Sequence, residues 1–120
     1  MDIQTEIIDT QRSLLRPIGR LDAESSPKLR QAIMDQIGAG AQGIIVDLAQ
    51  VDFMDSSGLS ALVSGIKSLR GAGGMLAICN ANPQVRTALR LTMLDRVFPA
   101  HESLAQARQH IEEHIAASHD

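Results

Sequence analysis

The sequence predicts an α/β protein whose mixed sheet is flanked by about four helices. Short apolar runs are typical of buried strands, and apolar residues spaced three and four apart between them are typical of helices. Glycine and proline mark the boundaries of these segments. Because strand-helix-strand units recur, part of the sheet should be parallel. A length of 120 residues with 44% hydrophobic content fits a single domain over residues 1–120.

The first 18 residues predict a β-hairpin. Apolar and polar residues alternate over residues 3–7, residues 9–12 supply turn formers, and Leu14 to Ile18 begins a second strand. Pro17 has no N–H to donate to a neighbouring strand. We therefore expect the second strand to be bulged at Pro17, or the missing amide to face no neighbour.

A first helix is predicted to begin between Asp22 and Pro27. Ser26 and Pro27 provide a cap followed by a proline at the first helical position. The apolar stripe of this helix comprises Leu29, Ile33 and Ile37. Gly38 and Gly40 should end it.

The middle of the chain predicts a buried strand joined to a second helix. Residues 43–48 form a nearly continuous apolar run, which indicates a strand covered on both faces. The stripe of the helix comprises Leu59, Leu62, Val63, Ile66 and Leu69. Between strand and helix, the segment 52–59 places Ser56 and Ser57 at a helix N-terminus. Asp and Ser side chains accept hydrogen bonds from the amides of a first helical turn, so N-capping alone could explain these residues.

The last third predicts two strands and two helices. Residues 71–74 are glycine-rich and form a turn before a strand over residues 75–79. Residues 82–83, Asn-Pro, repeat the signal of a cap followed by proline, which indicates a third helix. A short strand near residues 96–98 and a terminal helix over residues 103–117 complete the prediction.

Several motifs together match the pattern of one protein family. Residues 19–22 read Gly-Arg-Leu-Asp, similar to a Gly-Glu-Leu-Asp turn, and residues 45–48 with 55–59 are similar to a core signature. Further similarity lies in residues 73–76, 85–89 and 94–98. The chain resembles the anti-sigma factor antagonists, the bacterial branch of the STAS (sulphate transporter and anti-sigma antagonist) domains. The resemblance covers about residues 12–108 and implies a STAS-like fold.

The resemblance implies a binding module that is switched by phosphorylation and has no catalytic activity. In this family the first serine after the aspartate is phosphorylated, which corresponds to Ser56, with Ser57 as its neighbour. The unphosphorylated protein would bind an anti-sigma factor that is also a serine kinase, and so free a sigma factor. Phosphorylation of Ser56 would end binding, and a separate serine phosphatase would reverse it.

The resemblance also implies a partner-binding surface beside Ser56. Its residues would be Asp22, Met54, Asp55, Ser56, Ser57, Gly58 and Leu59. Met54 or Leu59 would offer apolar contact if exposed. Asp22 could equally be a cap of the first helix. An alternative function is that of a STAS module in a stress-signalling or lipid-transport assembly, without a phosphorylation switch.

Composition argues against several other classes of partner. The net charge is -3 and the basic residues form no dense run, so we expect no nucleic-acid partner. The first six residues lack the layout of a signal peptide, and no apolar run is long enough to span a bilayer. We therefore expect no membrane association and a cytoplasmic protein. The one cysteine, Cys79, cannot form an internal disulfide.

One short motif suggests an enzyme. Residues 110–114 fit the H-x-x-E-H pattern, in which His110 and His114 would bind zinc and Glu113 would act as general base. A zinc-dependent hydrolase is thus a remote alternative. A zinc site needs a third protein ligand, and the next carboxylate is Asp120 at the end of the sequence. We expect a solvated helix face here, with no metal or other cofactor.

Overall fold

One mixed sheet organises the structure, a computed structural model that describes residues 1–97 and 100–118. Its strands are β1 (Asp2–Ile7), β2 (Arg12–Leu21), β3 (Gly43–Asp47), β4 (Val51–Met54), β5 (Met75–Cys79) and β6 (Ala100–His101). The order is β1-β2-β3-β5-β6, and β4 also pairs with β2. β1 and β2 are antiparallel, and the other pairs are parallel. The predicted hairpin and mixed α/β sheet are confirmed.

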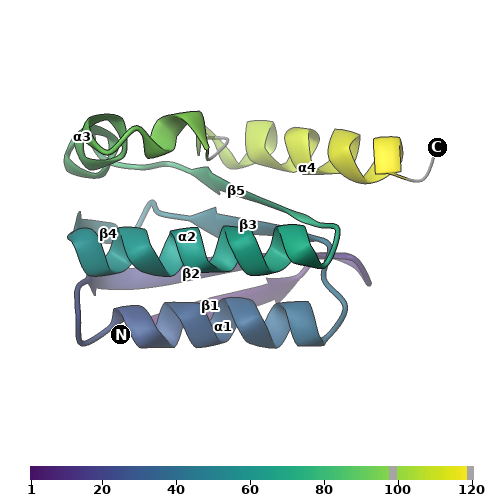
Figure 1. Ribbon diagram of the computed structural model, residues 1–120, viewed down its shortest axis with the longest axis horizontal. Coiled ribbons are helices and arrows are strands. Elements are labelled where there is room, and N and C mark those ends of the chain that lie inside the picture. Colours follow the sequence, from purple (N-terminus) through teal and green to yellow (C-terminus); the bar gives the residue numbers. More distant parts are fainter. Residues whose placement is uncertain (98–99, 119–120) are drawn as a thin grey trace.

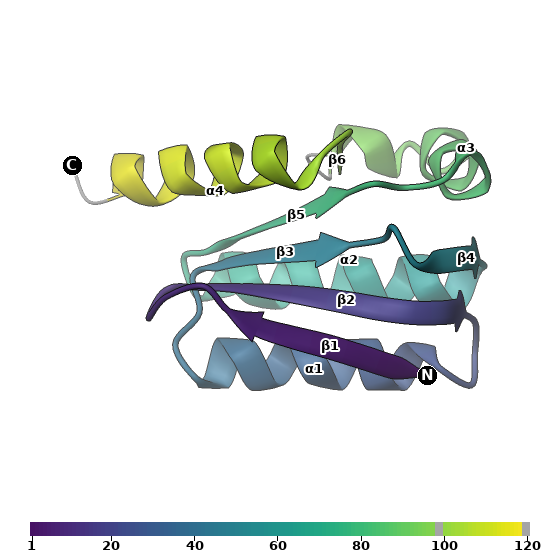
Figure 2. The same ribbon diagram turned by 180° about the vertical axis from the view of Figure 1, so that it is seen from behind.

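Helices cover both faces of this sheet. They are α1 (Ser26–Gly38), α2 (Ser56–Gly71), α3 (Pro83–Leu91), the short 3-10 helix η1 (Leu94–Arg96) and α4 (Leu104–Ser118). α1 and α2 lie side by side on one face of the sheet (Figure 1), and the opposite view shows β1 and β2 in front of them (Figure 2). Within the described ranges, no helix combines the length and the apolar composition needed to cross a membrane.

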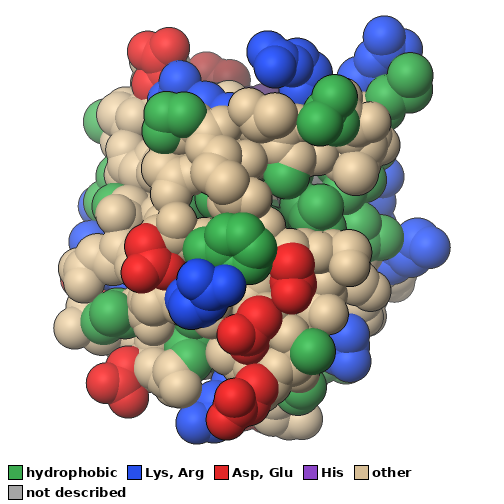
Figure 3. Space-filling model, turned by 90° about the vertical axis from the view of Figure 1, so that its left-hand side faces the viewer, with side chains coloured by type: hydrophobic (Ala, Val, Ile, Leu, Met, Phe, Trp, Pro, Cys, Tyr) green, Lys and Arg blue, Asp and Glu red, His purple; other side chains and the backbone are tan. Residues whose placement is uncertain are grey.

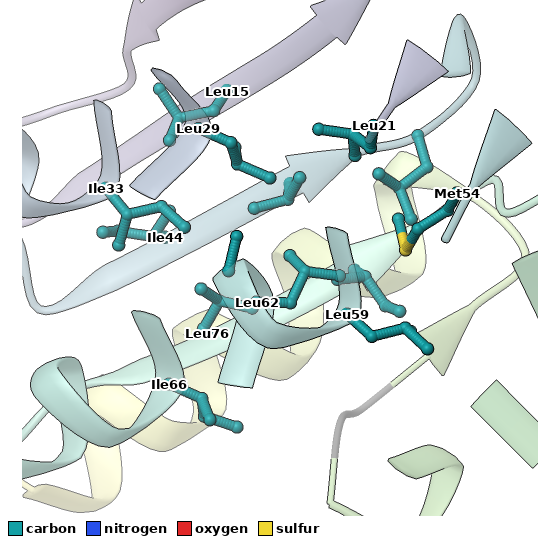
Figure 4. Packing of buried hydrophobic residues seen from close by; sticks show 14 of the residues in the cluster. Leu15, Leu21, Leu29, Ile33, Ile44, Met54, Leu59, Leu62, Ile66 and Leu76 are labelled. Carbon is teal, nitrogen blue, oxygen red and sulfur yellow. The ribbon is translucent and has the colours of Figure 1, made fainter. Parts of the chain in front are cut away.

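The central strands contribute to a hydrophobic core on each side of the sheet. Because successive strand residues point to opposite faces, Leu15 and Ile44 belong to the larger core, while Leu14 and Ile45 belong to a smaller core under α4. Figure 4 shows the larger core, where side chains of α1 and α2 meet those of the sheet. All residues of β3 are buried, as its continuous apolar run predicts.

β2 is longer than predicted and contains Pro17 in its middle. Residues 12–15 of this strand pair with β3, whereas residues 19–21 pair with β4. The register shift lies between Gly19 and Arg20, so it is not at Pro17 itself. Pro17 lies opposite Ile3 of β1, in the interval without a parallel partner. A residue that lacks an N–H is tolerated in such an interval.

Three sequence predictions need correction. β4 was not predicted, because its four residues include the charged Asp52 and give little strand signal. The strand predicted near residues 96–98 is wrong: Leu94–Arg96 forms η1 and the strand is Ala100–His101, while Phe98 lies outside the described residues. The cap of α1 is Ser25, and Ser26 is already helical.

Candidate functional site

The junction between β4 and α2 presents Ser56 to solvent. Asp55 is the extended N-cap of α2, and its Oδ1 accepts hydrogen bonds from the Ser57 amide at 2.8 Å and the Gly58 amide at 3.3 Å. Ser56 is exposed and Ser57 is half-buried. Among the described residues, the Ser56 hydroxyl has no hydrogen-bond partner. Capping is thus the role of Asp55, and it leaves the Ser56 hydroxyl available.

Asp22 organises the turn between β2 and α1. Its Oδ1 accepts hydrogen bonds from the Glu24 and Ser25 amides, each at 3.1 Å, and from the Ser25 hydroxyl at 3.2 Å. The bond from the Ser25 amide is the main cause that lowers the pKa of Asp22 below its usual value. Asp22 therefore caps the turn before α1, while its side chain stays 35% exposed.

The Asp22 turn and the Ser56 junction come together because β2 and β4 are paired. Leu21 lies beside Met54 in this pairing, and the Asp55 amide donates to the Leu21 carbonyl at 3.1 Å. Gly58 permits this approach: a Cβ at this position would lie 2.9 Å from the Leu21 carbonyl oxygen and 2.6 Å from Met54 Cγ. From the sequence, only the family resemblance predicted that Asp22 and Ser56 belong to one surface.

The buried apolar residues of the site support it from within. Met54 is 1% exposed and Leu59 is 7% exposed, and both pack in the core shown in Figure 4. The sequence predicted that Met54 or Leu59 would offer apolar contact to a partner only if exposed. Because both side chains are buried, this condition is not met. Gly58 is also buried. These three residues hold the junction in place from the interior.

Sequence reasoning missed a contact on the surface of this site. The Arg20 guanidinium lies over the Phe53 ring, 4.2 Å from its centroid, and 4.0 Å from the Asp22 carboxylate. Figure 3 shows this end of the molecule, where a basic side chain lies against an apolar one with acidic side chains nearby. Arg20 is in register with Phe53 across β2 and β4, so their contact depends on a strand pairing that was not predicted.

α3 fixes the outer edge of β4 through side-chain hydrogen bonds. The Gln84 amide bonds both backbone groups of Met54, accepting from its N–H at 3.0 Å and donating to its carbonyl at 2.9 Å. Asn82 Nδ2 donates to the carbonyls of Val51 and Asp52 at 3.1 and 3.2 Å. These bonds occupy backbone groups that an edge strand would otherwise offer to another chain. The strand that leads to Ser56 is thereby held on both sides.

The histidines of α4 are part of no recognisable metal centre in the part of the chain that the structure describes. No group of three His, Cys, Asp or Glu side chains in that part could hold an ion. His110 instead contacts His101, with ring centroids 5.0 Å apart. Asp120, the remaining candidate ligand, lies outside the described residues. Burial raises the pKa of the Cys79 thiol to about 12, so it is a neutral core group.

Comparison with known proteins decides the family. The model of the STAS domain family matches residues 2–107. The chain belongs to the STAS domain family. Among similar proteins, the "Anti-sigma F factor antagonist" of Paenibacillus polymyxa is 29% identical over 114 residues, which cover 93% of this chain and 97% of that one. The "Anti-sigma-B factor antagonist" of Listeria monocytogenes is 30% identical over 102 residues, 82% and 88% of the two chains.

Solved structures of anti-sigma factor antagonists share this fold. The crystal structure of an anti-sigma factor antagonist from Mycobacterium paratuberculosis superposes with a TM-score of 0.83 at 27% identity, covering 92% of this chain and 93% of that one. The STAS-like fold expected from the sequence is therefore confirmed. The pairing of β2 with β4 brings the Asp22 turn next to the end of β4, which leads into the start of α2.

Proposed function

We propose that this chain is an anti-sigma factor antagonist, a single STAS domain that binds and has no catalytic activity. In its unphosphorylated form it binds an anti-sigma factor with serine kinase activity and so frees a sigma factor in the cytoplasm. The observation that carries the proposal is the exposed Ser56 at the start of α2, whose helix is already capped by Asp55. Relatives that bear the name of anti-sigma factor antagonists support it.

Ser56 is the proposed phosphorylation site. Its hydroxyl is exposed, whereas Ser57 is half-buried and donates its amide to the cap. A phosphate at a helix N-terminus gains about 0.3–1 kcal/mol from the helix dipole. Asp55 is close in sequence and repels the new charge, so the net stability of the fold should change little. A separate serine phosphatase would restore the hydroxyl.

Phosphorylation weakens binding through local charge. The phosphate adds about -1.5 to -2 charges at neutral pH. One like charge on the partner at ~5 Å, with an effective dielectric constant of ~20, costs roughly 3 kcal/mol. That cost corresponds to a loss of ~100-fold or more in affinity. The switch therefore needs no change of fold.

The binding surface consists of the Asp22 turn together with the exposed residues at the start of α2. Because Met54 and Leu59 are buried, the proposed contact with the partner is made instead by Phe53 together with the Arg20 guanidinium that lies over its ring. A STAS module of a stress-signalling or lipid-transport assembly is the alternative. It would use the same surface but would not be modified at Ser56.

Mass spectrometry after incubation with the cognate anti-sigma kinase and ATP tests the proposal. We expect one phosphate, on Ser56, in the wild type and in the matched control Ser57→Ala. Ser56→Ala should stay unmodified and bind the kinase persistently, and Ser56→Asp should bind it poorly. A phosphate on Ser57, or modification that persists undiminished in Ser56→Ala, would show that Ser56 is not the hydroxyl that is modified.

Two substitutions separate the binding and capping roles of Asp22. Asp22→Asn keeps an oxygen that can accept from the Ser25 and Glu24 amides, but it removes the charge. Asp22→Lys reverses the charge. We expect both variants to fold and both to bind the kinase more weakly in a titration, Asp22→Lys the more so. Wild-type affinity in both, with unchanged circular dichroism, would leave Asp22 as a cap alone.

A further inference from the structure

A hollow separates the start of α1 from the start of α2, directly beside Ser56. Its volume is about 340 Å³, and its walls include Ser26 and Arg30 from α1 and Ser56 and Ser60 from α2. Residues four apart lie on the same side of a helix, so each helix presents one such pair to the hollow. Of the described residues that line it, Arg30 alone carries a charge. The hollow is thus electropositive, although the chain as a whole is acidic.

Two groups in its wall lack partners. Ser26 is 2% exposed, and its hydroxyl oxygen has no hydrogen-bond partner among the described residues. A buried hydroxyl without a partner is costly, and a bound group that accepts its hydrogen bond would remove that cost. Arg30 is exposed, and no acidic side chain of the described residues forms an ion pair with it. The nearby Asp55 carboxylate is bonded to the Ser57 and Gly58 amides and is not part of the wall.

We propose that this hollow binds the phosphoryl group of phosphorylated Ser56, with the Arg30 guanidinium as its counter-ion and the Ser26 hydroxyl as a hydrogen-bond donor. This inference rests on the proposed function. In the kinase step, Ser56 Oγ forms a bond to the γ-phosphorus of ATP, the bond from that phosphorus to ADP breaks, and the hydroxyl proton is released. The dianion then lies beside a planar cation that suits phosphate oxygens.

Binding of the phosphoryl group by Arg30 and Ser26 would connect α2, which carries phosphorylated Ser56, to α1. The phosphoryl group on α2 would be held by side chains of α1, the helix that follows the Asp22 turn. The phosphate would therefore rest between the two parts of the proposed partner surface, where it blocks both. Arg30 balances part of its charge within the protein, which explains how the folded state can accept a dianion close to Asp55.

The test uses protein with phosphoserine incorporated at position 56 during synthesis, so that it needs no kinase. A phosphorus NMR titration measures the second pKa of the phosphate, which is about 6 without neighbours. We expect this pKa to be lowered in the otherwise unchanged chain and to rise by about 0.5 pH unit in Arg30→Gln, the size expected of an exposed ion pair. Ser26→Ala should raise it less, and Arg30→Lys should restore part of the shift.

Lys28→Gln is the matched control. Lys28 is an exposed cation on the same helix but does not line the hollow, so its removal should leave the pKa nearly unchanged. Equal shifts in Lys28→Gln and Arg30→Gln would overturn the proposal, because they would reflect only the general field of the protein. The Arg30 Nε–H signal should move in the phosphoserine protein and not when inorganic phosphate is added to unmodified protein. An equal movement with inorganic phosphate would make the hollow a site for free phosphate and overturn the covalent assignment.

Discussion

Replacing Gly58 by alanine tests whether close contact between α2 and the end of β2 sets the geometry of the site. The new Cβ would lie 2.6 Å from Met54 Cγ and 2.9 Å from both Cβ and the carbonyl oxygen of Leu21. The Met54 side chain can shift, but the Leu21 carbonyl is backbone and accepts the Asp55 amide at 3.1 Å. Relief of the clash must therefore move β2 and α2 apart.

Two opposed terms set the size of the effect. Overpacking of a tight core costs about 1–3 kcal/mol. Exchange of a helical glycine for alanine returns about 0.5–1 kcal/mol, because the unfolded chain loses freedom and helix propensity rises. The clash exceeds the propensity gain, so the free energy of unfolding should fall by about 1–2 kcal/mol. For a chain of this size, that fall lowers the Tm by roughly 4–10 °C.

Gly71→Ala in the same helix is the control. A Cβ at Gly71 would have no heavy atom within 4 Å, so this variant should be as stable as the wild type or slightly more stable. Urea unfolding followed by circular dichroism gives both free energies, and a titration with the anti-sigma kinase reports on the site. Gly58→Ala should also bind more weakly, because the Asp22 turn moves relative to Ser56. Stability equal to that of Gly71→Ala would refute the argument that Gly58 sets this contact.

Three further predictions concern the cap, pH and metal. Asp55→Ala should lower the free energy of unfolding, measured in urea, by about 1 kcal/mol, because it removes the N-cap of α2. The control Asp52→Ala replaces an exposed aspartate and should change this free energy little. Equal effects of the two substitutions would show that the Asp55 cap does not stabilise the helix. Burial, with the charge of His110, lowers the pKa of His101 below 6.5 in the folded chain. As pH falls, His101 is therefore protonated at a higher pH in the unfolded chain than in the folded chain. Stability should therefore decline below pH 6.5 in the wild type and less steeply in His101→Gln, as urea midpoints between pH 5 and 8 will show. A chelator should leave the Tm unchanged, since His110 and His114 have no third ligand among the described residues; a tightly held zinc ion whose removal lowers the Tm would revive the hydrolase alternative.

Local sequence patterns determined most elements of this protein. The apolar run of residues 43–48 predicts a buried strand because a strand covered on both faces needs apolar side chains in succession. The Asp-Ser-Ser-Gly segment predicts a capped helix start, since a cap and the amides it bonds are two or three residues apart. Such signals are readable from sequence because the interacting groups are close neighbours along the chain.

Tertiary structure alone decided how these elements form a site. β4 has a weak strand pattern and is held by β2 on one side and by Gln84 on the other. That pairing brings the Asp22 turn next to the end of β4, buries Met54, and aligns Arg20 with Phe53. Backbone hydrogen bonds between strands have the same chemistry for almost every residue type, so their partners cannot be read from the residues themselves. The packing of α1 against α2, which creates the hollow around Arg30, depends in the same way on contacts between segments far apart in the sequence.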